Sequence, residues 1–291
     1  MVLKVISPFL VAVFLIACGD NNPSSVTLSD KKEADPAATS SVSKLSSGKN
    51  TKSSSSSVKS KNSAVLSSSS MLSVKPCKTE SEDSCEYGSL TDERDGQRYK
   101  TVKIGNQWWM AENLNYQTEN SYCYNDSISN CAKFGRFYTW SAVMDSAGIW
   151  SMDGYGCGYS KYKTCYKTIS PTDLVRGVCP SGWHVPSKTE FETLMTSVGG
   201  SQNAGLMLKS ASGWRDNANN SLGNFSFSAL PAGIRSDNGM SFRKGSDAYF
   251  WSSSEDSFLQ AIGMDLYCYN NESELLPYYK NMGFSIRCVK D

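Results

Sequence analysis

The sequence predicts an α+β fold, and three features of the chain support this prediction. The first is a capped helix, in which Ser187 and Glu190 have capping-box spacing and apolar residues follow at helical intervals from Phe191 to Val198. The second is a series of apolar segments with strand-like composition in the last third of the chain. The third is their order, because early helices followed by late strands are typical of α+β domains.

The first residues have the pattern of an export signal. Lys4 precedes an apolar run over residues 5–16, which is too short to span a bilayer. The run ends in Leu-Ile-Ala before Cys18, which resembles the lipobox of bacterial lipoproteins. We expect residues 1–17 to be a signal peptide and Cys18 to carry the lipid that holds the protein on a membrane. The alternative is an ordinary cleaved signal with a buried thiol. Gly19, in place of an aspartate, favours the outer membrane or cell surface of the envelope.

The composition divides the rest of the chain. Residues 18–76 hold no aromatic residue and are rich in serine, so we expect a disordered tether. Residues 77–93 are interpreted as a disulfide-looped lead-in, and residues 94–291 as one large domain, since all but two aromatic residues follow Glu86. With 29 basic and 28 acidic residues, the chain gives no electrostatic reason to expect nucleic acid as a partner.

Further elements are expected on both sides of the capped helix. The expected strands cover residues 99–104, 107–110, 225–227, 249–251, 260–268 and 283–289, and the further helices cover 134–147 and 201–209. Residues 113–130 are expected to be a polar loop, and 154–168 an irregular loop pinned by a disulfide. Trp108 and Trp109 are adjacent on one strand, so only one of them can face the core. Trp251 is expected near the capped helix.

Nine cysteines remain once Cys18 is set aside. Equal spacing suggests three local loops, Cys77 with Cys85, Cys123 with Cys131, and Cys157 with Cys165, although many other pairings are open. Cys288 shares a strand face with Phe284 and Ile286, and its natural partner is Cys179. Cys268 is left over as a buried free thiol, an intermolecular link, or a sign that one local pairing is wrong. With no C-x-x-C pair and one histidine, a metal site has little support.

Several uncommon clusters resemble one known family. The segments RDGQRYKTVKIGNQWWMAENLNY, GVCPSGWHVPSKTEFETL, FSALPAGIR, YFWSSSE and GFSIRCVKD look like the Fibrobacter succinogenes major paralogous domain. The resemblance implies an exported bacterial surface domain with a C-type lectin-like, formylglycine-generating-enzyme-like fold and no settled activity. It also implies that the chain ends pair as strands and that a long disulfide joins the helical region to a late strand, in agreement with Cys179 and Cys288.

Catalytic and cofactor sites find little support in the sequence. The calcium-binding motifs of the related lectins are absent, and residues 214–217 are only a loose echo of one, so calcium is not expected as a cofactor. His184 lies at a helix entrance and is expected to be structural. The available carboxylates form no evident pair: Glu112, Asp216, Asp237, Glu255 and Asp256. We therefore expect a protein that is not an enzyme, with a hydrolase as the least favoured hypothesis.

An aromatic surplus and polar loops favour a binding role. Sugar rings stack on exposed aromatic rings while polar side chains take their hydroxyls. The candidate ligand-binding residues are Trp108, Trp214, Asp216, Tyr278 and Tyr279. The expected function is recognition or adhesion by a membrane-anchored, lectin-like domain, with a polysaccharide or an envelope protein as partner. The alternative is a disulfide-stapled structural module that assembles within the envelope, with Cys268 as a possible link.

Overall fold

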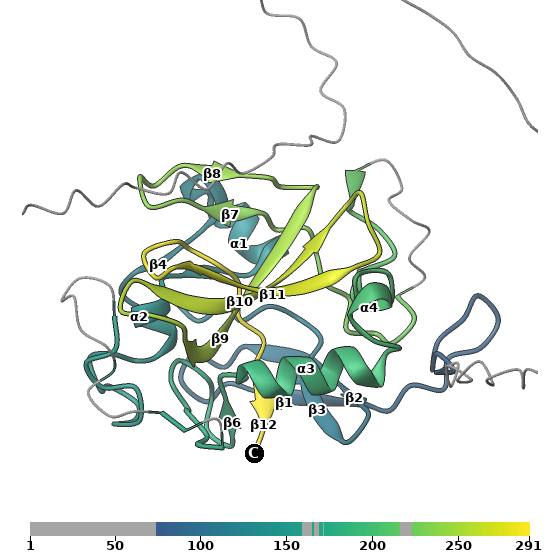
Figure 1. Cartoon of the computed structure of the whole chain (residues 1–291), viewed down its shortest axis with the longest axis horizontal. Helices are drawn as coiled ribbons and strands as arrows, with labels where there is room; N and C mark the ends of the chain where they lie inside the picture. The colour runs from purple at the N-terminus through teal and green to yellow at the C-terminus, as the bar shows by residue number, and fades with distance from the viewer. Residues whose placement is uncertain (1–73, 159–164, 166–168, 171, 216–222) are drawn as a thin grey trace, which may run out of the picture. The chain divides into compact units, whose positions relative to one another are not determined.

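The computed structural model describes residues 74–158, 165, 169–170, 172–215 and 223–291 (Figure 1). The predicted signal peptide, Cys18 and the tether up to residue 73 lie outside these residues, as does Asp216. Within the described part, no helix is both long enough and apolar enough to cross a membrane.

The largest sheet joins the start of the domain to its end. It has five strands in the order β1-β2-β3-β12-β6. These strands are β1 (Tyr87–Thr91), β2 (Arg98–Ile104), β3 (Gln107–Met110), β12 (Val289–Lys290) and β6 (Trp183–His184). The predicted hairpin is β2 with β3, where Trp109 is fully buried and Trp108 is half-buried, as expected of adjacent strand residues. Because β12 lies between β3 and β6, the last residues of the domain are part of the sheet that begins with β1.

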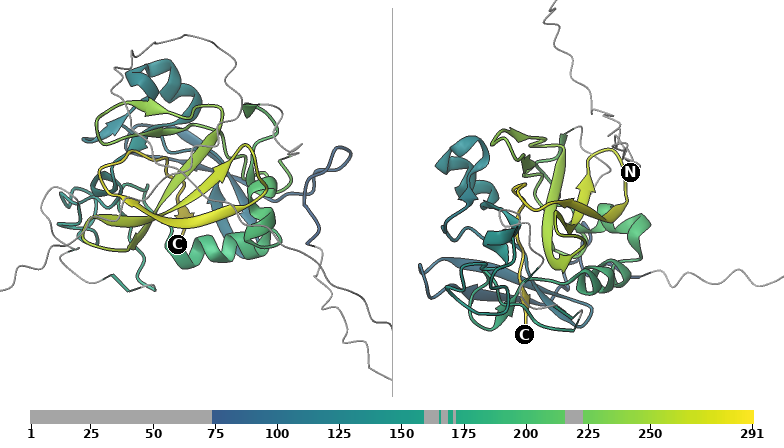
Figure 2. Two further views of the ribbon diagram at one scale, coloured as in Figure 1. Left: turned by 45° about the horizontal axis from the view of Figure 1, so that its top comes forward. Right: turned by 60° about the vertical axis from the view of Figure 1, so that its left-hand side comes forward.

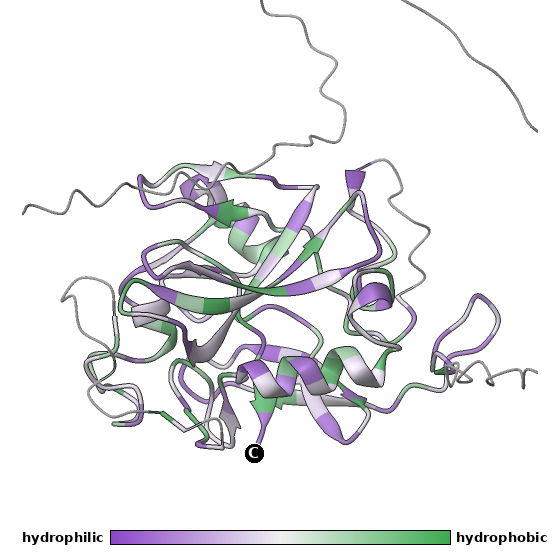
Figure 3. Ribbon diagram, viewed as in Figure 1, coloured by the Kyte–Doolittle hydropathy of each residue, from purple (hydrophilic) through white to green (hydrophobic). Residues whose placement is uncertain are grey.

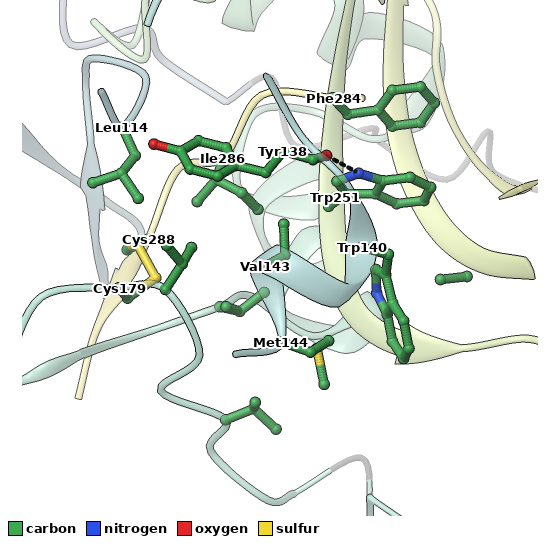
Figure 4. Packing of buried hydrophobic residues seen from close by; sticks show 14 of the residues in the cluster. Leu114, Tyr138, Trp140, Val143, Met144, Cys179, Trp251, Phe284, Ile286 and Cys288 are labelled. Atoms are coloured by element: carbon green, nitrogen blue, oxygen red, sulfur yellow. Dashed lines mark hydrogen bonds between the residues drawn. A yellow bond between two sulfur atoms is a disulfide. The ribbon is translucent and has the colours of Figure 1, made fainter. Parts of the chain in front are cut away.

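A second sheet separates two apolar clusters. It contains β9 (Asp247–Glu255), β10 (Gln260–Tyr267) and β11 (Ser273–Tyr279), with β10 in the middle. Alternate residues of β9 point to opposite faces, so Trp251 belongs to one cluster and Phe250 to the other. Trp251 stacks on Phe284 at 4.2 Å and donates a hydrogen bond to the Tyr138 carbonyl (Figure 4). The expectation that Trp251 packs near the capped helix is therefore wrong. Its neighbour Phe250 instead belongs to the cluster that contains the apolar residues of that helix.

The capped helix is α3 (Lys188–Ser197), and its capping box is confirmed. The Ser187 hydroxyl accepts from the Glu190 amide, and the Glu190 carboxylate accepts from the Ser187 amide at 2.8 Å. Hydrophilic and hydrophobic residues alternate along this helix (Figure 3). On its apolar side Phe191 stacks on Trp109 at 5.4 Å, which packs α3 against the five-stranded sheet. The shorter α4 (Ser201–Leu208) follows, with Gly200 rather than Ser201 at its N-cap.

Small elements complete the domain, and among them α1, β7 and β8 lie on the side away from the C-terminus (Figures 1 and 2). They are the pair β4 (Ser121–Tyr122) and β5 (Phe137–Tyr138), the hairpin β7 (Ile234–Arg235) and β8 (Ser241–Phe242), the 3-10 turn η1 (Tyr124–Asp126) and the helices α1 (Ile128–Phe134) and α2 (Trp140–Val143). The predicted polar loop over 113–130 thus contains a strand, a turn and the start of a helix.

The predicted helix over residues 134–147 is wrong. α1 ends where that helix was expected to begin, and α2 is a single turn. Gly135 interrupts the helical path with φ +74°, and a Cβ there would lie 2.6 Å from the Asn113 side chain and 2.9 Å from the Leu114 carbonyl. The close approach of this backbone to residues 113–114 overrides the helical spacing of the apolar residues.

Two predicted strands are largely replaced by irregular backbone. Residues 225–227 form no strand, because Ser226 and Ser228 have φ +55° and +53°. Residues 283–285 make isolated bridges, residues 286–288 make none, and only Val289–Lys290 belong to a sheet. Both departures involve Arg287, which is fully buried and donates to the carbonyls of Phe227 and Ser228. A buried guanidinium needs such acceptors, so the chain turns to present them.

Four disulfides match the pairs expected from the sequence. They are Cys77–Cys85, Cys123–Cys131, Cys157–Cys165 and Cys179–Cys288. The last joins residues 109 positions apart, and both of its cysteines are fully buried. None of the described cysteines is a free thiol, which removes the free-thiol alternative for the buried Cys268.

His184 connects the α3 cap to the last residue of the chain. Its Nδ1 lies 2.8 Å from an Asp291 carboxylate oxygen, and its Nε2 lies 2.8 Å from a Glu190 carboxylate oxygen. Burial lowers the pKa of His184, but the hydrogen bonds and charges of Glu190 and Asp291 outweigh burial and leave the pKa raised above its usual value. The protonated ring can donate to both carboxylates.

This arrangement predicts that the free energy of unfolding falls as the pH rises from about 6.5, the usual histidine pKa, through the higher pKa of the folded state. A raised folded-state pKa contributes stability at low pH and loses it once the ring deprotonates. Urea unfolding at several pH values checks this expectation. Since the chain has one histidine, His184→Gln should flatten the slope in this range, and an unchanged slope in the variant would contradict the assignment.

Candidate functional site

A cavity of about 240 Å³ lies beside α2, where three segments meet. Residues 118–120 come from the loop before β4, residues 141–150 from α2 and the turn after it, and residues 156–158 from the disulfide-pinned loop. Cys157 is fully buried in this wall and bonded to Cys165, so a covalent link holds it in place. Small ligands bind preferentially in concave sites, so this cavity is the candidate site.

Asp145 builds the turn that shapes one wall. It has φ +54° and is 5% exposed, and its carboxylate accepts hydrogen bonds from three successive backbone amides. The amides of Ile149 and Ser151 lie at 2.9 Å, and that of Trp150 also donates. With its oxygens occupied in this way, Asp145 serves as a structural group that positions Trp150 rather than as a base.

The Trp150 ring contacts a guanidinium group and a second aromatic ring. The Arg94 guanidinium lies 5.0 Å from the centre of the Trp150 ring and 3.9 Å from that of Tyr116. The two rings meet edge to face at 5.6 Å. Such contacts favour a fixed ring orientation. The Trp150 carbonyl also accepts from Arg176 at 3.1 Å, so both ring and backbone are held.

Arg94 is in turn held by Asp92, which is fully buried. The pair is bidentate, with Nε to Oδ1 at 2.8 Å and Nη2 to Oδ2 at 2.7 Å. The third nitrogen, Nη1, is buried without a hydrogen-bond partner among the residues described. The support beneath Trp150 therefore contains one donor that the described protein atoms leave unused.

The cavity lining also includes polar atoms that the described protein does not use. Glu119 is exposed, and neither its carboxylate nor the Ser146 hydroxyl makes a hydrogen bond within the part of the chain described. Asn120, at φ +58°, accepts from the Tyr122 hydroxyl at 3.3 Å and leaves its amide nitrogen without a described acceptor. Ile149, 58% exposed, gives the rim an apolar edge. A cavity lined by a tryptophan and by free hydroxyl, amide and carboxylate groups can hold a small polar ring.

The four described residues expected to bind ligand lie on different elements, and none of them lines the cavity. Trp214 is 9% exposed, and its indole nitrogen donates to Ser210 and to the Ala229 carbonyl at 3.2 Å, which leaves little ring for a ligand. Trp108 lies half-buried on β3 beside Gly88. On β11, Tyr278 packs on Phe284 and donates to Asp265, while Tyr279 is 53% exposed.

Other chemistry-bearing residues are committed to structural contacts. Glu112 accepts from the Lys100 amide at 2.7 Å, and Glu255 is paired with the buried Lys280. Burial raises the pKa of Asp265 to about 6, and its carboxylate accepts from Tyr267 and Tyr278. No group of three or more His, Cys, Asp and Glu side chains suited to a metal ion occurs among the described residues.

Sequence reasoning missed the Trp150 cavity. Arg94 lies in the β1–β2 turn, and Trp150 follows α2 in a loop. The available signal was a tryptophan in an irregular segment, since large aromatic residues in loops often mark binding sites. The partners that fix it come from segments distant in sequence.

Comparison with known proteins identifies the family. No curated protein and no solved structure gave a significant match. The model of the Fibrobacter succinogenes major domain matches residues 102–290, which is most of the domain expected from the sequence. This family points to a surface-associated domain and assigns it no activity. The chain therefore belongs to the Fibrobacter succinogenes major domain family.

Proposed function

We propose that this protein is an extracytoplasmic, lipid-anchored recognition module that binds a polysaccharide through the Trp150 cavity. The single observation that carries the proposal is that one small cavity is lined both by a tryptophan held by Arg94 and by unused polar groups. Pyranose rings present an apolar face and a rim of hydroxyls, and they suit such a site. The lipobox-like run before Cys18 supports attachment to the cell envelope, at the outer membrane or cell surface.

The size of the cavity limits what it can hold. Its volume of about 240 Å³ lies below the roughly 300–1,000 Å³ of sites that enclose drug-sized ligands. One terminal sugar unit, rather than a long stretch of chain, is the occupant that suits this volume. Binding to a polymer would then depend on the number of accessible chain ends.

Replacing Trp150 with alanine is expected to weaken polysaccharide binding about 30-fold, as loss of about 2 kcal/mol at a central aromatic contact does. The measurement is a pull-down of the full-length protein, in detergent, on insoluble cellulose, xylan and chitin, with and without a calcium chelator. Trp150→Phe should retain most of the binding because a ring remains. Trp108→Ala is the matched control, since Trp108 is also half-buried but lies outside the cavity lining. Equal losses in the two alanine variants would argue against the site.

A second candidate is assembly with another envelope protein. Ile149, Met152 and Tyr155 are 58%, 67% and 46% exposed, and Met152 and Tyr155 both lie about 3.0 Å from the position of a Cβ at Gly148. A cluster of exposed apolar residues is typical of protein interaction surfaces. Cross-linking in native membranes tests this function, and recovery of the monomer alone would count against it.

A further inference from the structure

The described residues that line the Trp150 cavity carry charge of one sign. No lysine, arginine or histidine is among the described residues that line it, and two carboxylates are, those of Glu119 and Asp145. Asp145 is buried and saturated by backbone amides. Glu119 is exposed and unpaired within the described chain, so it is the lining charge that a ligand can meet.

The described cations that contact Trp150 are Arg94 and Arg176, and both are already engaged; Arg136 donates to Gln117, in the same loop as Glu119, at 2.8 Å. Arg94 lies behind Trp150 and is neutralised by its bidentate pair with Asp92. Arg176 donates to the carbonyls of Trp150 and Cys179, on the backbone side of the wall. An anionic ligand in the cavity would therefore lose part of its hydration and meet a carboxylate instead of a cation.

We infer that the cavity selects the terminal sugar by charge, taking hexosamine units with a free ammonium ahead of neutral hexoses and rejecting uronic acids, with Glu119 as the residue that sets this order. The inference rests on the proposed function of the same site. Trp150 supplies the stacking surface that all three sugars share, because every pyranose has an apolar face. The three differ in what they bring to Glu119: an ammonium, a hydroxyl or a second carboxylate.

The expected discrimination is moderate because Glu119 is exposed to water. Two unit charges about 4 Å apart in water interact by an amount equivalent to about a fivefold change in affinity. Affinity should therefore differ by up to about fivefold between hexosamine and neutral sugar, and again by up to about fivefold between neutral sugar and uronate. High salt should reduce both differences in affinity, since exposed charges are screened.

The test is calorimetric titration of the full-length protein, in detergent, with three trisaccharides of glucosamine, glucose and galacturonic acid at about pH 6, below the usual pKa of an amine. Glu119→Gln should bring the glucosamine and glucose trisaccharides to equal affinity. Glu119→Lys should reverse the order so that galacturonate binds best. Glu192→Gln is the matched control, because Glu192 is an exposed glutamate on α3, outside the cavity.

The outcomes separate this inference from the proposed function. Binding of all three sugars with equal affinity, or an order that Glu119→Gln leaves unchanged, overturns the charge selection while sugar binding at the site stands. Loss of binding in Trp150→Ala together with the expected Glu119 pattern supports both. If none of the three trisaccharides binds the wild-type protein, the proposed function fails and the inference fails with it.

Discussion

Replacing Cys179 and Cys288 together with alanine is expected to lower the free energy of unfolding by about 4–5 kcal/mol. The disulfide joins residues 109 positions apart, and in the chain-entropy model the stabilisation grows with the length of the closed loop. Both cysteines are fully buried between the helical region and the last strand, so the variant also loses buried contacts. Many domains have little more stability than this, and the variant should be largely unfolded in mild denaturant.

The measurement is urea unfolding of the wild type and the variant under non-reducing conditions. The matched control is Cys77→Ala with Cys85→Ala, which opens a loop whose ends are 8 positions apart and should cost about 2.5 kcal/mol in the same model. The difference between the two losses in free energy of unfolding shows how far the stabilisation depends on the length of the closed loop. Equal losses for the two pairs would show that loop length does not govern their contribution.

The parts of the fold that could be predicted from sequence are those fixed by local chemistry. The α3 cap depends on Ser187 and Glu190, which are three residues apart, and the hairpin of β2 and β3 depends on a two-residue turn. β1 was not expected, since its sequence YGSLT has little strand character and its pairing depends on β2. β11 contains Pro277, which suits an edge strand but weakens a strand prediction.

The candidate site could be predicted from the sequence even less well than these strands. Its aromatic wall depends on Trp150, its support on Arg94 and its free carboxylate on Glu119, and only the folded chain brings these three together. The aromatic residues singled out from the sequence were chosen by composition, and composition does not distinguish a ring in the core from one in a cavity. Trp214 is an example, because both of its polar contacts are internal.

Glu255→Gln is expected to lower the free energy of unfolding by about 3 kcal/mol. Its carboxylate is paired with the Lys280 ammonium, whose side chain is fully buried while that of Glu255 is 20% exposed. Removing one partner of a buried pair leaves an uncompensated charge, which costs about 3–5 kcal/mol. The remaining partners of Lys280 would be the Phe258 carbonyl at 3.2 Å and the Trp140 ring at 4.6 Å. Neither carries a full negative charge.

Denaturant unfolding checks this expectation, with Asp256→Asn as the control because Asp256 is the exposed acidic neighbour. The double variant Glu255→Leu with Lys280→Met should be more stable than Glu255→Gln, since it removes both charges. If Glu255→Gln falls within about 0.5 kcal/mol of the wild type, the size of a typical surface substitution, the pair contributes little.

Glu255→Gln is also expected to weaken ligand binding, because Glu255 contacts a segment of the cavity wall. The second carboxylate oxygen of Glu255 accepts from the Cys165 amide at 3.3 Å, and Cys165 is bonded to Cys157 in the cavity wall. A loosened Glu255 should let this wall shift while Trp150 and its Arg94 support stay in place. Affinity for a neutral trisaccharide should therefore fall by less than in Trp150→Ala, and the charge order set by Glu119 should persist. Binding that is unchanged in a destabilised Glu255→Gln protein would mean that the wall is held by its disulfide alone.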